Sequence, residues 1–229
     1  MSVKITWLGH SAFALDVDGH PVVIDPFLTG NPLAAAEPDD VKAEFVLLSH
    51  GHGDHVGDTV SIARRTGASV VTNFEIANWL QKQGVEKTVG LNTGGQFNAG
   101  FMTIKSTYAI HSSSLPDGTY AGLAGGFLIT AGSRRLYFAG DTALFSDMQL
   151  IADEGMIDLA FLPIGDFFTM GIDDSLKALR YLHPRIVMPM HYNTFPPIMQ
   201  EVSKWANRVS SETSAQPVIV DPGGSYTLS

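Results

Sequence analysis

Short apolar runs rich in β-branched residues recur along the chain between Gly, Pro and Asp. Runs of this length, bounded by turn residues, predict β-strands. Residues 4–8 and 12–25 form an expected N-terminal meander, with Asp18-Gly19 as a hairpin turn. Further strands are expected at residues 44–49, 69–73, 102–109, 125–130, 135–140, 158–164 and 185–190.

Four other stretches repeat apolar residues every three or four positions, which predicts amphipathic helices. They span residues 58–67, 75–84, 173–184 and 197–209, and the first pattern can be extended back to His55. Meanders mixed with strand–helix units indicate an α/β protein with helices outside the sheets. Because no linker or repeat interrupts the pattern, we expect one domain over residues 1–229.

Composition narrows the possible functions. The net charge is −9 and the basic residues are scattered, apart from two Arg-Arg pairs. A dedicated nucleic-acid partner is therefore not expected, because such binding needs a clustered basic face, although a small phosphate ester stays open as a substrate. The chain lacks cysteine, which excludes thiolate ligands and cysteine nucleophiles. With neither a leader-like N-terminus nor a membrane-length apolar run, the protein is expected to be cytoplasmic.

Four of the expected strands end on a side chain that can bind a metal. These side chains are His50, His111, Asp141 and His191. Ligands of layered α/β proteins bind at the ends of strands, where loops bring side chains to one point while the sheet holds them rigidly. We therefore expect these four side chains to converge.

The sequence SHGHGDH at residues 49–55 places three histidines and an aspartate in one loop. His50 and His52 are two residues apart and can face the same way, whereas the adjacent Asp54 and His55 must diverge. The loop thus offers two pairs of ligands aimed at two places. Asp54 and His55 would stand at a helix N-terminus, which favours a carboxylate and tolerates a neutral imidazole. With His111, Asp141 and His191 there are enough imidazole and carboxylate groups for two ions.

The motif HGHGDH resembles the HxHxDH motif of the metallo-β-lactamase superfamily, and His111, Asp141 and His191 follow in that superfamily's order. The stretches WLGHSAF, AIHSSS, FAGDTALF, PIGDFFTMG and PMHYNTFPPI are similar to small metal-dependent hydrolases akin to the ascorbate-phosphate lactonases. This resemblance covers essentially the whole chain. It implies an αββα sandwich of two mixed sheets, with a two-metal site at one edge.

The resemblance also implies a ligand set, position by position. One divalent ion would be held by His50, His52 and His111, and the second by Asp54, His55 and His191, with Asp141 bridging both. Zinc is the expected ion, with manganese or iron as alternatives. Two such ions can share a hydroxide that acts as the nucleophile, so Asp54 and Asp141 would be the catalytic carboxylates.

Three further residues are candidates for the surroundings of the metals. Asp25 ends an apolar run and could orient a ligand imidazole through its distal N–H, although it also suits a turn before Pro26. His10 and Asp166 also follow strands, and each can equally be structural. His20 and His183 are interpreted as structural.

Three functions compete. A dinuclear hydrolase of a small ester, lactone or phosphodiester is the leading hypothesis. A nuclease or nucleotide phosphodiesterase of the same superfamily would need a basic groove, and a non-catalytic metal-binding protein would not need the full set of seven ligands. Four aromatic residues lie beside the expected site loops, and the sequence does not distinguish whether they form pocket walls, core or contacts in a homo-oligomer. They are Phe167, Phe168, Tyr192 and Phe195.

Overall fold

The N-terminal meander forms as the sequence predicts. Val17 pairs with His20 across the Asp18-Gly19 turn, and both turn residues take a left-handed φ. This conformation matches the twist of two antiparallel strands joined by two residues. The first sheet contains, in spatial order, β14 (Ser225–Leu228), β1 (Val3–Gly9), β2 (Ala12–Val17), β3 (His20–Ile24), β4 (Phe45–Leu47), β5 (Ser69–Asn73) and β6 (Thr88–Leu91).

The second sheet also has seven strands, and the computed structural model describes all 229 residues. Its strands pair antiparallel over residues 96–138 and in parallel over residues 134–217. In spatial order it contains β13 (Gln216–Pro217), β12 (Ile186–Met190), β11 (Leu159–Pro163), β10 (Arg134–Phe138), β9 (Gly125–Ala131), β8 (Thr103–Tyr108) and β7 (Gln96–Asn98).

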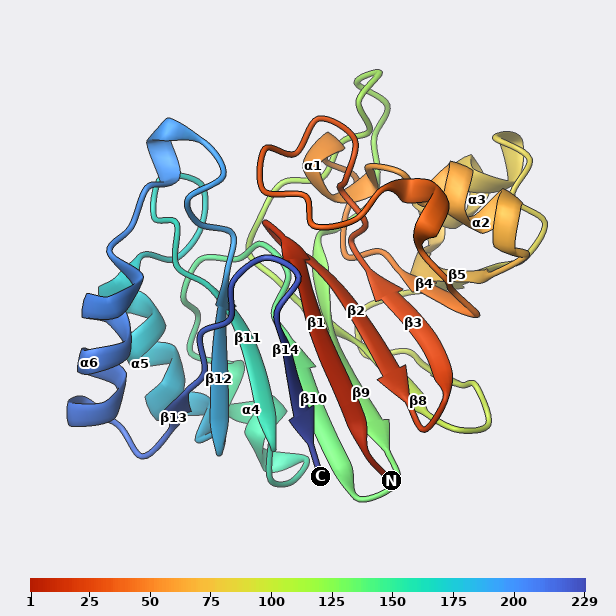
Figure 1. Cartoon of the computed structure of the whole chain (residues 1–229). Coiled ribbons are helices and arrows are strands. Elements are labelled where there is room, and N and C mark those ends of the chain that lie inside the picture. The colour runs from red at the N-terminus through yellow and green to blue at the C-terminus, as the bar shows by residue number, and fades with distance from the viewer.

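The longer helices lie outside the two sheets, so the predicted αββα sandwich is confirmed (Figure 1). None of them combines the length and apolarity needed to cross a membrane. The α-helices are α1 (Gly53–Val56), α2 (Thr59–Thr66), α3 (Phe74–Lys82), α4 (Met148–Asp153), α5 (Ile172–Leu182) and α6 (Val202–Glu212), and short 3-10 helices occupy Pro38–Asp40 and Pro196–Ile198.

Two expected helices begin later than their patterns predict. The helix extended back to His55 breaks at Gly57, where a Cβ would lie 2.5 Å from the carbonyl oxygen of Pro26. The resulting short α1 lets Asp54 and His55 take a direction independent of α2. The helix expected from residue 197 begins at Val202, because the residues before it form a 3-10 turn.

The main core lies between the two sheets and combines buried side chains from both. Phe13 of β2 packs against Phe161 of β11 with ring centroids 4.6 Å apart, and against Phe138 of β10. A smaller core fills the space between the first sheet and helices α2 and α3. The sheets are thereby held as one rigid support for the loops at their edges.

Removing the central aromatic ring tests this packing. Phe13→Ala leaves a cavity between the sheets and is expected to lower the free energy of unfolding by about 3–5 kcal/mol, measured by denaturant titration. Leu150→Ala is the control, since Leu150 is 62% exposed on α4. Equal unfolding midpoints for the two variants would contradict the assignment of Phe13 to the core.

Candidate metal centre

Six of the strands that end at one edge of the sandwich are followed by a residue whose side chain suits the metal centre. The sequence places these residues after β1, β3, β4, β8, β10 and β12: His10, Asp25, His50, His111, Asp141 and His191. Three of the six have a left-handed φ, at 56°, 44° and 54° for His10, Asp25 and His191. Such a conformation costs free energy in non-glycine residues and is frequent at functional sites.

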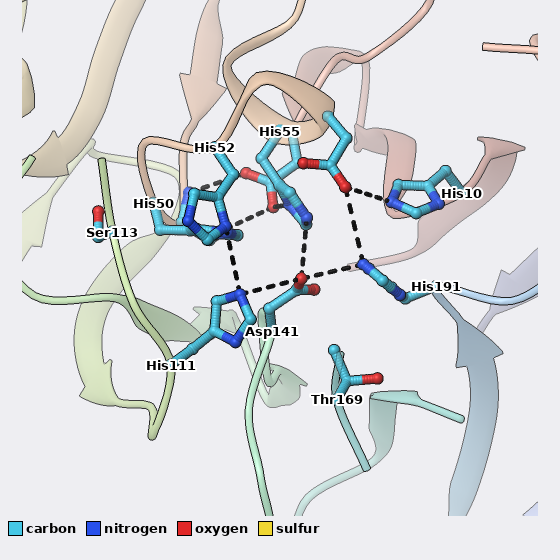
Figure 2. A network of polar contacts seen from close by, with 12 residues as sticks. His10, His50, His52, His55, His111, Ser113, Asp141, Thr169 and His191 are labelled. Carbon is cyan, nitrogen blue, oxygen red and sulfur yellow. Dashed lines mark hydrogen bonds and ion pairs between the residues drawn. The ribbon is translucent and has the colours of Figure 1, made fainter. Parts of the chain in front are cut away.

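Three imidazoles form the first group of donor atoms. His50 Nε2 lies 3.0 Å from His52 Nδ1, which lies 3.2 Å from His111 Nε2 (Figure 2). His52 Nδ1 carries at most one proton, so it cannot donate to both neighbours. Ligand atoms of a tetrahedral zinc ion are about 3.3 Å apart, given bond lengths near 2.0–2.1 Å. The spacing of these nitrogens fits a bound divalent ion.

A second group consists of His10, Asp54, His55 and His191, with one donor atom from each within 4.8 Å of the others. His55 Nε2 is buried and makes no well-formed hydrogen bond, although Asp141 Oδ2 lies 3.3 Å from it. A buried nitrogen without a hydrogen bond is costly, and a metal ion at this position would remove that cost.

Asp141 connects the two groups. Its Oδ2 lies 3.6 Å from His111 Nε2 in the first group, and 3.3 Å and 3.0 Å from His55 Nε2 and His191 Nε2 in the second. Figure 2 shows this oxygen between the imidazoles. The structure therefore brings all seven residues of the expected ligand set to one place.

Asp25 orients one imidazole in each group. Its carboxylate accepts hydrogen bonds from His55 Nδ1–H at 2.7 Å and from the Ser49 hydroxyl at 2.6 Å. Because that hydroxyl donates to Asp25, its oxygen accepts from His50 Nδ1–H at 3.0 Å. The Nε2 atoms of both histidines are thereby directed to the donor groups. Ser49 was missed by sequence reasoning, although its place directly before the first motif histidine was a signal.

His10 is buried in the second group. Its Nε2 lies 3.2 Å from Asp54 Oδ2, and its Nδ1 lies 2.8 Å from the hydroxyl of Thr194. Thr194 follows the β12 strand together with His191, so one loop supports both histidines. Thr194 was also missed, because a single threonine in a loop gives no distinguishing pattern.

Asp166 does not join the donor atoms. It is exposed, takes a left-handed φ of 71°, and its carboxylate lies against Gly171 within its own loop. The remaining excluded histidines also have local contacts. His20 pairs with Glu44 and stacks on Phe101, and His183 caps the C-terminus of α5.

Charge balance in this region requires positive charge. Burial lowers the pKa of His50 well below its usual value. Burial also opposes protonation of His55, yet the carboxylates of Asp141, Asp25 and Asp54 raise the pKa of His55 well above its usual value. Burial alone would raise the pKa of Asp141, but His191 and His55 lower it well below its ordinary range. A divalent cation would supply the positive charge that a protonated His55 otherwise provides.

Comparison with known proteins gives the family. A family profile described as "Beta-lactamase superfamily domain" matches residues 4–191. A UPF0173 metal-dependent hydrolase of Thermus thermophilus is 49% identical, covering 96% of this chain and 97% of its own. A homologous UPF0173 metal-dependent hydrolase of Bacillus cytotoxicus is 48% identical, covering 99% and 100%. The chain belongs to the UPF0173 metal-dependent hydrolases of the β-lactamase superfamily.

A solved structure agrees with this assignment. Igni18, described as a novel metallo hydrolase from the archaeon Ignicoccus hospitalis, superimposes with a TM-score of 0.92 at 38% identity, covering 100% of this chain and 99% of its own. The resemblance found in the sequence motifs is thus confirmed, as is the expected class, a metal-dependent hydrolase of the metallo-β-lactamase superfamily.

Asp25 offers a test of ligand orientation in this hydrolase. Asp25→Asn removes one of the acceptors for His55 and Ser49, so metal affinity is expected to fall about 10- to 100-fold, measured by competition with a chromophoric chelator. The matched control is Asp174→Asn, which loses only a surface contact with Lys177. Unchanged affinity in Asp25→Asn would show that the carboxylate does not orient the imidazoles.

Metal binding is also expected to release protons. Without metal, His55 keeps its proton at neutral pH because its pKa is raised, and a metal needs the neutral imidazole. The apparent affinity should therefore fall as pH decreases, by about tenfold per unit for each proton released. Calorimetric titrations in buffers of different ionisation enthalpy measure this number. An affinity that does not change between about pH 6 and 8 would contradict the assignment of His55 to the centre.

Proposed function

We propose that this metal-dependent hydrolase is dinuclear and acts on a small ester, lactone or phosphodiester. The observation that carries the proposal is the position of Asp141, whose Oδ2 lies within 3.6 Å of imidazole nitrogens from both donor groups. A single carboxylate oxygen so placed suits a bridge between two ions better than a ligand of one.

The residues divide between two ions as the sequence motifs imply. His50, His52 and His111 would hold one ion, and Asp54, His55 and His191 the other, with Asp141 between them. Nitrogen and oxygen donors suit zinc, which we propose first, with manganese or iron as alternatives. When bound, two divalent ions lower the pKa of a shared water toward neutrality and polarise the bond under attack.

The side chains of the protein prepare this chemistry without attacking the substrate themselves. The hydroxyls of Ser49 and Ser113 both donate to acceptors within the protein, so they support the loops. Burial would raise the pKa of Asp54, but His55 and His10 hold it well below the usual value, so Asp54 is a carboxylate at neutral pH. Catalytic roles for Asp54 and Asp141 as ligands are consistent with these charges.

Removing the bridge tests the proposal. Asp141→Ala is expected to lower the bound metal from two ions to one or none and to abolish hydrolysis, since the oxygen shared by both groups is lost. The matched control, Asp166→Ala, changes an exposed carboxylate and should keep both ions. Metal content is measured by elemental analysis and activity on a panel of esters, lactones and phosphodiesters. A metal-free Asp141→Ala that stays active would contradict the proposal.

The same panel separates the competing functions. Two bound ions with no hydrolysis of any compound would favour a non-catalytic metal-binding protein. Hydrolysis restricted to nucleotides or nucleic acid would favour the phosphodiesterase. The cytoplasmic location, the lack of a dedicated nucleic-acid partner and self-association of the chain stay predictions.

A further inference from the structure

The loops at the metal edge of the sandwich contain no lysine or arginine. The chain has 14 basic residues, and all lie in other segments. These metal-edge loops are defined as the segments at the end of the sheets that carries the donor atoms. They are residues 10–11, 25–37, 48–58, 92–95, 109–124, 139–147, 164–171, 191–201 and 218–224. Ten of the chain's 23 acidic residues lie in the same loops.

Several basic side chains form ion pairs on the outer helices and on strand segments away from this edge. Arg208 of α6 pairs with Asp173 and Glu212. Near the start of β10, Arg134 lies 3.6 Å from Asp158. Lys105, in the middle of β8, contacts Glu154. Arg65, near the end of α2, donates to the carbonyls of Pro38 and Val41, which follow the loop of residues 25–37. The metal-edge loops themselves contain no cationic side chain to receive an anion.

The same loops expose large apolar side chains. Phe167, the most exposed, is 72% accessible, and its ring meets that of Phe168 edge to face at 4.8 Å. Exposed apolar residues that share one surface usually mark a binding region. The apolar rim, as we name it, consists of Ile110, Tyr120, Leu123, Phe167, Phe168 and Met199.

Backbone contacts place Ile110 and the loop with Phe167 and Phe168 close to the donor residues. Ile110 directly precedes His111, and its N–H donates to the hydroxyl of Thr142, the neighbour of Asp141. The loop with Phe167 and Phe168 is joined to the same segment by Met170 N–H, which donates to the Thr142 carbonyl at 3.0 Å. Figure 2 draws Thr169 of this loop in the same view as Asp141 and His191.

We propose that the enzyme selects substrates whose non-reacting part is uncharged and apolar, such as the alkyl or aryl group of a neutral ester or lactone. This inference rests on the proposed function and specifies its substrate class. A remote phosphate or carboxylate would normally be bound by Arg or Lys. Here it would meet no such partner and would lie among like charges, including those of Asp117, Asp147 and Asp166.

A matched pair of esters tests the selection. The zinc-loaded enzyme is given 4-nitrophenyl hexanoate and mono-4-nitrophenyl adipate, which share the scissile bond and differ by one remote carboxylate. We expect kcat/KM to be at least about tenfold higher for the neutral ester. Equal or faster hydrolysis of the adipate would overturn the inference.

A second pair measures the preference without turnover. Hexanohydroxamic acid and the monohydroxamic acid of adipic acid bind metal centres through the same group, and calorimetry gives their affinities for the loaded enzyme. If neither ester is cleaved but the neutral hydroxamate binds at least about tenfold more tightly, the inference holds while the hydrolase proposal fails. Equal affinities overturn the inference, whatever the enzyme hydrolyses.

Variants assign the preference to the rim. The double variant Phe167→Ala, Phe168→Ala should reduce the preference for the neutral compounds several-fold and keep two bound ions, whereas Leu150→Ala, exposed on α4, should change neither. Analytical ultracentrifugation is run on each protein. The inference is overturned if the double variant dissociates from an oligomer and still prefers the neutral compounds. That result would show that a second copy of the chain covers the rim.

Discussion

The buried carboxylate of Asp25 is the interaction on which the rest of the site depends. It is completely buried, and it accepts the Ser49 N–H, the Ser49 hydroxyl and His55 Nδ1–H at 2.6–2.8 Å. These contacts tie the end of β3 to the end of β4 and to α1. One group therefore determines which nitrogen two different histidines present, and a shift of Asp25 would disturb both donor groups together.

The fold keeps this arrangement although it is unfavourable without a cation. Asp25, Asp54 and Asp141 lie near one another, and His10, Asp25 and His191 adopt left-handed backbone conformations. Strain and crowded carboxylates lower stability, and the core between the two sheets must offset them. The strand ends are rigid because the rings of Phe13, Phe138 and Phe161 pack between the sheets. Packing of the aromatic core between the sheets thus offsets the free-energy cost of the strained and charged site.

Most strands and the sandwich fold could be predicted from the sequence. Short apolar runs between turn residues indicate strands, and the HxHxDH motif is typical of one fold. The convergence of His50, His111, Asp141 and His191 followed from their places at strand ends. The break at Gly57 could not be predicted, because the backbone of Pro26, which is distant in sequence, leaves no space for a side chain there. Short elements such as α4 and β7 were missed because a few residues carry too little periodicity, and Ser49 acts through contacts that only the folded chain creates.

The segregation of charge becomes evident in three dimensions, because the long stretches without basic residues, 5–41 and 136–176, fold into several of the loops at the metal edge. An acidic edge has a consequence for encounter with substrates. Carboxylates on the surrounding loops repel anions from a distance of about 8–10 Å, the range over which salt leaves such fields unscreened. Bound ions, largely compensated by their own ligands, would attract anions only at close range. Binding energy for the non-reacting part of a substrate must then come from contact with apolar surface, which the loops beside Asp141 provide.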